Sequence, residues 1–237
     1  MSRMPKINRA THEPLREQVL HHCRNLLMRG NLLPGQKLAL RPLAHEFHTS
    51  LMPVRDALNR LVADGALEFT GGRRIRVPVM TKERVVELHE IRSSLEGLAG
   101  RLATPNLTNE AIDRAELLIA DMEAAFIKKD FDAYMSAHFS FHFTIYSAAD
   151  RSTLLALIET LWLRLGPSFR QGIEGARAIA SSDSEPGDPN QFHRGIITAL
   201  RSRDARAARD AIETDIATGI EVYRTGCWPV NDMQGGT

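Results

Sequence analysis

The sequence predicts a mainly α-helical fold in two parts: a small N-terminal domain of three helices and a β-hairpin, and a C-terminal antiparallel α-helical bundle of six or seven helices. Apolar residues recur at helical spacing along most of the chain, and two β-like runs between residues 66 and 79 flank a Gly-Gly pair. The sign of the net charge changes near residue 80, just after the predicted hairpin. Residues 1–80 hold 13 Lys and Arg against 6 Asp and Glu, whereas residues 81–237 hold 17 against 23. A basic domain joined to an acidic one is typical of a protein that contacts phosphate groups with one end.

The composition excludes several classes of protein. The chain has 237 residues, of which 43% are hydrophobic and 25% charged, as in globular domains with a buried core. Two cysteines are too few for a disulfide-stabilised secreted module. No apolar run approaches the roughly 18 residues that cross a bilayer, and the first residues contain no apolar signal segment. We therefore expect a reduced, cytoplasmic protein with no membrane partner.

The first domain begins with two predicted helices. Apolar side chains recur on one helical face of residues 13–29, and Gly30 ends that helix. A Pro-Gly pair then predicts a turn, which leads into a short helix over residues 41–47. Residues 1–10, ahead of both helices, contain three basic side chains and are expected to form a flexible arm that attracts phosphate nonspecifically.

The third helix has two distinct faces. Ser50 is a favourable N-cap, and the residues after it place apolar side chains on one face: Val54, Ala57, Leu58, Leu61 and Val62. The opposite face presents Met52, Arg55 and Asn59, which the core does not need. These three side chains are therefore expected to contact something outside the domain.

A basic hairpin is predicted after the third helix. The β-like runs over residues 66–70 and 74–79 place Arg73, Arg74 and Arg76 at or near its tip, where they either contact DNA or keep the hairpin soluble. Three helices followed by such a hairpin make a winged helix-turn-helix. That unit places its third helix in the major groove of DNA, while the wing reaches phosphates or the neighbouring minor groove.

Three segments carry a family resemblance. The first domain resembles the DNA-binding domain of GntR-family bacterial transcription regulators in Leu32-Leu33-Pro34-Gly35-Gln36-Lys37-Leu38, in Arg41-Pro42-Leu43-Ala44 and in Ser50-Leu51-Met52-Pro53-Val54-Arg55-Asp56-Ala57-Leu58. The resemblance implies that Arg41 and Arg55 contact operator DNA and that Gly72 forms the wing tip. Family members often have a basic residue directly after the Ser, where this chain has Leu51, which cannot form a bidentate contact to guanine. The complete predicted DNA surface is Arg41, Ser50, Met52, Arg55, Asn59, Gly72, Arg73 and Arg74.

Six helices are predicted after the hairpin. Apolar stripes cover residues 85–102, 112–126, 131–145, 154–165, 192–200 and 205–223. Gly166-Pro167 is expected to break the fourth of these, and residues 172–190, rich in Ser, Asp, Pro and Gly, are expected to form a mobile loop. The predicted domains are a winged helix-turn-helix over 11–79 and a helical bundle over 80–226, followed by a tail over 227–237.

Inward-facing polar residues mark a candidate metal site in the bundle. His138 and His142 are four residues apart on an apolar helical row, His193 lies on the row of Ile196, and Asp215 lies beside apolar residues of the last helix. An inward carboxylate without a partner would be costly, and a divalent cation would bind all four groups at once. A lone histidine on such a row is more often a core residue. His89 is expected on the polar side of its helix.

The bundle also carries a resemblance. Residues 82–225 resemble the FCD ligand-binding domain of the FadR branch of the GntR family, and many such domains bind metal through one Asp and three His. The resemblance implies that His138 stands where the family usually has Asp, whereas Asp215 stands where it has the final His; His142 and His193 match family ligands. The ligand set is expected to be retained in permuted order. Nitrogen and oxygen ligands with open positions suit Zn²⁺, Ni²⁺ or Mn²⁺.

The metal is expected to hold a small organic acid, an effector with a carboxylate group. Arg92 and Arg164 are candidate second anchors for that anion. Each is equally well explained as a structural ion-pair partner, for example Arg92 with Glu96 one turn further on. The His-x-x-x-His pair lacks the adjacent Glu that serves as general base in metalloproteases, so hydrolysis is not expected.

Together these features predict a ligand-responsive transcriptional regulator, a repressor, that is not an enzyme. A homodimer is expected to bind a palindromic operator in double-stranded DNA, and the effector is expected to alter operator affinity. Two alternatives remain open from the sequence. One is a metal-dependent enzyme or metal-storage bundle fused to a nucleic-acid module, and the other is a metal-sensing regulator in which the ion itself is the signal.

Overall fold

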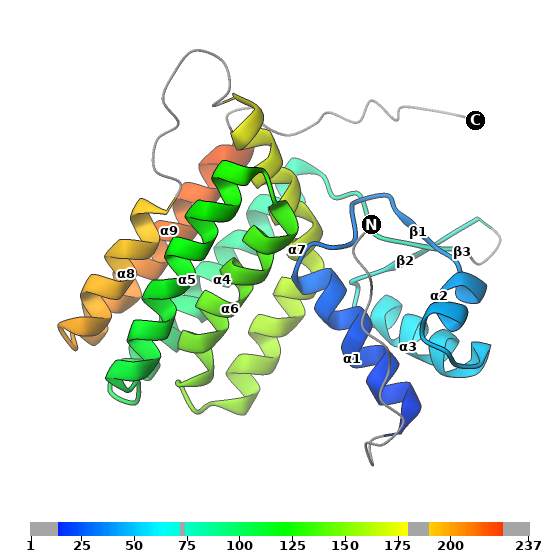
Figure 1. Cartoon of the computed structure of the whole chain (residues 1–237), viewed down its shortest axis with the longest axis horizontal. Coiled ribbons are helices and arrows are strands. Elements are labelled where there is room, and N and C mark those ends of the chain that lie inside the picture. The colour runs from blue at the N-terminus through cyan, green and yellow to red at the C-terminus, as the bar shows by residue number, and fades with distance from the viewer. Residues whose placement is uncertain (1–13, 72–73, 180–189, 225–237) are drawn as a thin grey trace. The chain divides into compact units, whose positions relative to one another are not determined.

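The computed structural model describes residues 14–71, 74–179 and 190–224, and the contacts among them divide the chain into two compact units (Figure 1). The first unit contains the residues up to Met80 together with residues 159–168, and the second contains the remainder. The predicted arm over 1–10 and the tail over 227–237 lie outside the described residues. None of the helices within the described ranges combines the length and the apolar character needed to cross a membrane. The mainly α-helical fold class is confirmed.

The first unit contains the three predicted helices. They are α1 (Leu15–Met28), α2 (Leu40–Glu46) and α3 (Leu51–Ala63). Gly30 and Gly65, which follow α1 and α3, adopt positive φ angles of 62° and 70°, a backbone conformation that glycine reaches without strain. The helices enclose an apolar core whose fully buried side chains include Val19, Leu27, Phe47, Val54, Leu58 and Leu61.

The sheet of the first unit has one strand more than the predicted hairpin. Strands β2 (Glu68–Thr70) and β3 (Arg74–Arg76) form the antiparallel wing, and β1 (Lys37–Leu38) adds to β3, giving the order β1-β3-β2. The wing strands are shorter than predicted. The sequence did not reveal β1 because two residues show no alternation of apolar and polar side chains, and its partner strand lies far along the chain.

Six helices follow the wing within the described residues; five lie wholly in the second unit, and α7 has only its two ends there because residues 159–168 belong to the first unit. The six helices are α4 (Lys82–Ala103), α5 (Asn109–Lys128), α6 (Phe131–Ser147), α7 (Ser152–Ile179), α8 (Gln191–Arg201) and α9 (Ala205–Arg224). Thr81, Thr108 and Asp130 cap α4, α5 and α6, because each side chain accepts a hydrogen bond from the third residue of its helix. The most extensive packing joins α4 to α9, α5 to α6 and α8 to α9.

Two glycines allow α4 and α9 to approach closely. A Cβ atom on Gly100 would overlap the Ile212 Cδ1 methyl group, and one on Gly97 would lie 2.7 Å from Glu213 Oε1. The pair brings Asp215 of α9 into the interior of the second unit, where its side chain is 14% exposed.

The predicted break at Gly166-Pro167 is wrong. Helix α7 continues through Pro167 to Ile179, so residues 172–179 of the expected loop are helical, and residues 180–189 lie outside the described residues. Proline removes one helical hydrogen bond, but its fixed φ angle is compatible with a helix. Burial of the neighbouring Leu165 and Phe169 offsets the lost bond, and this packing could not be read from the local sequence.

Candidate functional site

The predicted DNA surface begins with α2 and α3. The α3 helix buries Val54 and Leu58, and on the opposite side Met52, Arg55 and Asn59 are exposed. Arg41, at the start of α2, is also exposed. Within the described part of the chain, neither Arg41 nor Arg55 forms an ion pair, so both guanidinium groups are available to an anionic partner.

The N-terminus of α3 differs from the capped helices of the second unit. Ser50 has the extended backbone of an N-cap, but its exposed side chain makes no capping hydrogen bond. Helix N-termini carry unsatisfied N–H groups and a partial positive charge, and both favour a phosphate group. The start of α3 is therefore suited to contact a DNA backbone.

The wing contributes fewer basic side chains than its sequence suggests. Arg76 Nε donates a 2.6 Å hydrogen bond to Glu68 Oε1, its partner across the strands, so this charge is already compensated. Arg74 is exposed at the start of β3. Gly72 and Arg73, the predicted wing tip, lie outside the described residues.

The three predicted histidine ligands come together in the second unit. His138 and His142 project from α6 and His193 from α8, and their metal-ligand atoms all lie within 4.8 Å of one another. His142 is 0% exposed and His193 4%, whereas His138 is partly exposed. Burial, reinforced by the neighbouring histidines, holds the pKa of His138 and of His142 well below its usual range. Both rings are therefore neutral at pH 7, which is the form that binds metals.

Asp215 of α9 adjoins two of these histidines. Its Oδ2 atom lies 3.8 Å from His142 Nε2, and its Oδ1 atom lies 3.6 Å from His193 Nε2. Both ring nitrogens of His193 are buried and have no hydrogen-bond partner among the described residues. A buried polar atom in this state costs about 1–3 kcal/mol, so the site favours an additional ligand at this point.

The donor set fits a divalent transition metal. Three imidazole nitrogens and one carboxylate oxygen are ligands that Zn²⁺, Ni²⁺ and Mn²⁺ accept. Two nitrogens that are each about 2.1 Å from one ion lie roughly 3–4 Å apart, so the three histidines would close slightly on binding. The separation of up to 4.8 Å is within reach of small side-chain rotations.

A chain of buried hydrogen bonds orients His142. Arg92 Nε and Nη2 donate to the two carboxylate oxygens of Glu96 at 2.5 and 3.1 Å, and the Tyr146 hydroxyl donates to Glu96 Oε2 at 2.6 Å. Because that hydroxyl has a single proton, it accepts from His142 Nδ1, 2.9 Å away. Nδ1 then carries the ring proton, which leaves the Nε2 lone pair directed towards Asp215 and the other ligands.

Arg92 and Arg164, the predicted effector anchors, have different surroundings. Arg92 forms the ion pair with Glu96 that the alternative interpretation expected. Arg164 does not accompany the histidines: it belongs to the first unit, where Nε and Nη2 donate to the Asp64 carbonyl oxygen at 3.0 and 2.9 Å. Its guanidinium group thus satisfies the carbonyl that ends α3, a role that no local pattern indicates.

Two residues near the histidines were missed. His89 was expected on a polar surface, but it is 1% exposed, its Nδ1 lies 2.8 Å from the Val85 carbonyl oxygen, and burial lowers its pKa to about 3. Phe169 of α7 contacts the rings of His89 and His138 edge to face, and the Arg92 guanidinium lies 4.6 Å from its ring centroid. The continuous apolar pattern of α7 could have revealed Phe169 if the helix had not been ended at Pro167.

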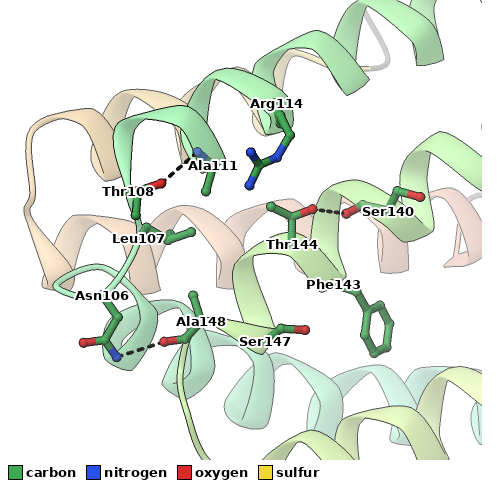
Figure 2. A pocket seen from close by; sticks show the side chains of 10 residues that line it. All are labelled: Asn106, Leu107, Thr108, Ala111, Arg114, Ser140, Phe143, Thr144, Ser147 and Ala148. Atoms are coloured by element: carbon green, nitrogen blue, oxygen red, sulfur yellow. Dashed lines mark hydrogen bonds between the residues drawn. The ribbon is translucent and has the colours of Figure 1, made fainter.

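A separate cavity of about 570 Å³ lies on the other side of α6 (Figure 2). Its lining comes from the turn before α5, from α5 and from α6, and includes Arg114, Ser140 and Thr144. At 100° per residue these α6 positions point away from His138 and His142. The cavity is therefore not the interior of the histidine cluster.

Two protein-family models match the chain. The model described as bacterial regulatory proteins, gntR family, matches residues 15–77, and the FCD domain model matches residues 87–218, more than half of the chain. The boundaries of the matches fall within the two units described above.

Curated relatives and solved structures agree with these models. The HTH-type transcriptional regulator McbR of Escherichia coli is 29% identical over 92% of this chain and 97% of its own length. The probable D-xylose utilization operon transcriptional repressor of Paenarthrobacter nicotinovorans is 32% identical over 81% of this chain and 80% of its own length. The solved structure of E. coli McbR/YncC matches with a TM-score of 0.77 at 27% identity, over 90% of this chain and 98% of that one.

Proposed function

This chain belongs to the gntR family of bacterial regulatory proteins and carries an FCD domain, and from that premise we propose that it represses transcription from a palindromic operator under the control of a metal-bound organic acid. It is a DNA-binding transcriptional regulator and not an enzyme. We assign operator binding to residues 11–79 and effector binding to residues 80–226. Because the operator is chromosomal DNA, the protein acts in the cytoplasm.

Operator binding is supported above all by the exposed face of α3, which includes Arg55, together with Arg41 of α2; neither arginine forms an ion pair among the described residues. Arg55 would contact base edges in the major groove, since arginine binds guanine O6 and N7 in bidentate fashion. Arg41 and Ser50 would contact phosphates and so fix the orientation of α3. On the same proposal, Asn59 extends the base-contacting face of α3. The wing, with Gly72, Arg73 and Arg74, would follow the adjacent DNA backbone.

A homodimer is the expected binding form. Helix-turn-helix proteins bind two half-sites about one helical turn of DNA apart, and a palindromic operator mirrors the two-fold symmetry of the dimer. Repression is the activity named for the xylose-operon relative. We extend it to this chain as part of the proposal.

The metal would be held by His138, His142, His193 and Asp215. The uncompensated nitrogens of His193 and the neutral state of the other two rings support this assignment. When bound, a divalent ion with open positions supplies Lewis-acid coordination for a carboxylate group. The chain's own contribution is to fix the ligand rings, and for His142 the bond to Tyr146 does so.

Arg92 would act through its neighbours rather than by direct capture of an anion. Its charge is compensated by Glu96, so an effector carboxylate would have to compete with a buried bidentate ion pair. Arg92 therefore holds Glu96 in place for Tyr146. Specificity for one organic acid would come from other residues around the ligand.

Operator titration tests the DNA-binding half of this proposal. Full-length protein is titrated into a fluorescent duplex containing its own upstream region at several salt concentrations, and binding is expected to weaken steeply as salt rises. Arg55→Ala is expected to weaken binding by about 5- to 150-fold, the loss of one bidentate base contact. Arg60→Ala is the matched control, because Arg60 is an exposed α3 arginine on a different side of the helix, 3.5 Å from Glu17. Equal binding by the wild type and Arg55→Ala would contradict the docking of α3.

Titration with effector tests the sensing half. The same measurement is repeated with a panel of sugar acids, dicarboxylates and amino acids, with the metal present or removed by a chelator. A shift in operator affinity that needs both acid and metal supports the proposal. A shift produced by the metal alone would instead support the metal-sensing alternative.

A further inference from the structure

The α3 helix begins with two apolar side chains in water. Leu51 is 38% exposed and Met52 59%, whereas Val54, Leu58 and Leu61 of the same helix are fully buried. Leu51 and Met52 are thus only partly buried by the core of the first unit. Covering exposed apolar surface with apolar atoms of a partner lowers the free energy, because it removes that surface from water.

The position of these side chains determines which partner they meet. They are the first two residues of α3, the helix proposed to enter the major groove, and the N-terminal residues of such a helix contact base edges. At 100° per residue Met52 shares a face with Arg55, and Leu51 borders it. Arg41 and Arg55, which flank this apolar pair in sequence and form no ion pair among the described residues, bring it to DNA, and so does the net charge of +7 over residues 1–80.

Thymine is the only base that presents a methyl group in the major groove. Guanine, adenine and cytosine expose hydrogen-bonding atoms there, whereas thymine also exposes a C5-methyl group. Leucine has no hydrogen-bonding atom, and the methionine sulfur is a weak acceptor. Covering a polar base edge with either side chain would remove water from that edge without replacing its hydrogen bonds, which is unfavourable.

We infer that each operator half-site contains a thymine whose C5-methyl group packs against Leu51 and Met52, next to the base contacted by Arg55. This inference rests on the proposed function and specifies it. It assigns an A·T base pair to the position where an arginine after Ser50 would select guanine. Leu51 and Met52 then determine specificity through apolar contact.

Replacement of thymine by deoxyuridine tests the contact, because it removes the methyl group and leaves every hydrogen-bonding atom unchanged. Operator sequences are first selected from random duplexes by the full-length protein. Each thymine of the selected half-site is then replaced in turn, and affinities are measured for the wild type, Leu51→Ala and Met52→Ala. Both substitutions are at exposed positions, and circular dichroism confirms that the variants are folded.

The expected result is a loss of about fourfold in wild-type affinity at one thymine per half-site, as for one methyl group returned to water. Uridine at that position should have no effect on a double Leu51→Ala, Met52→Ala variant, and uridine at other thymines should change wild-type affinity less than twofold. In addition, selection with Leu51→Arg should replace this thymine by guanine.

Two negative results have different meanings. If the protein selects a defined operator but no uridine substitution weakens binding, the thymine contact is refuted and the regulatory function stands. If no sequence is selected at all and binding does not depend on Arg55, the proposed function itself fails.

Discussion

Tyr146 and His142, one helical turn apart on α6, are joined by a buried hydrogen bond of 2.9 Å between the tyrosine hydroxyl and Nδ1 of the imidazole. Burial raises the pKa of Tyr146 well above its usual range, so the hydroxyl keeps its proton and donates it to Glu96. The imidazole must therefore donate from Nδ1. One tyrosine thereby selects the tautomer of a proposed metal ligand.

Loss of this hydroxyl should weaken metal binding without removing a ligand. For Tyr146→Phe we expect the affinity for Zn²⁺ to fall about 10- to 100-fold, the usual effect of removing an outer partner of a metal-bound histidine. Competition with a fluorescent chelator measures it. Tyr134→Phe is the control, because Tyr134 is equally buried on α6 but its hydroxyl bonds to Asn190. Equal affinities for the two variants would contradict the tautomer argument.

Direct removal of a ligand should abolish stoichiometric metal. His142→Ala and Asp215→Ala are expected to contain much less than one ion per chain by elemental analysis after dialysis, while His89→Gln, a substitution of a buried histidine outside the ligand set, should retain it. In the wild type, chelation should lower the melting temperature because a ligand that binds the folded state stabilises it. An undiminished metal content in both ligand variants would remove this site from consideration.

Arg41 should contribute to affinity but not to sequence preference. If it contacts a phosphate, Arg41→Ala should weaken binding to all duplexes by a similar factor and reduce the slope of log affinity against log salt by about 1. Arg55→Ala should instead relax the preference for one base. The two outcomes are separated by titrating each variant against the operator and against single-base variants of it; a base-specific loss for Arg41→Ala would contradict its assignment to the backbone.

Two helical glycines are expected to have opposite effects on stability: Gly100, at the contact between α4 and α9, and Gly195, on the exposed side of α8. Gly100→Ala should lower the free energy of unfolding by about 1–3 kcal/mol, since the added methyl group overlaps Ile212. Gly195→Ala should raise it by up to about 1 kcal/mol, because nothing lies within 4 Å of the added Cβ and alanine favours a helix. Urea denaturation followed by circular dichroism measures both; a stable Gly100→Ala variant would show that the two helices can separate without cost.

His89 predicts a loss of stability in acid. Burial, followed by the charge of Arg92, lowers the pKa of His89 to about 3 from its ordinary value of 6.5, so the folded state keeps the ring neutral while the unfolded chain protonates it. The contribution is present above pH 6.5 and is lost progressively as the pH falls towards 3. Between pH 7.5 and 5.5 the loss of stability amounts to roughly 1 kcal/mol. The wild type should therefore lose more stability over this interval than His89→Gln in urea titrations with chelator; parallel losses would show that His89 is not responsible.

The sequence located the helices and the histidine cluster well because both depend on periodicity. Apolar residues at positions such as Val54 and Leu58 predict a buried face, and the same spacing places His138 and His142 on one inward row. It failed where distant contacts decide. Pro167 stays helical because of packing around it, β1 exists because β3 is available to pair with it, and Arg164 binds a carbonyl group that is 100 residues away in the chain.

The membership of residues 159–168 in the first unit affects any dissection of the gene. Glu159 accepts from Arg24 at 2.8 Å, Arg164 binds the end of α3, and Gly166 lies so close to the Leu27 carbonyl oxygen that a side chain would not fit between them. A fragment that stops at Met80 lacks this segment and exposes the surface it covers. A fragment that starts at Thr81 carries the segment without its partners. Neither half produced by a single cut is a complete folding unit.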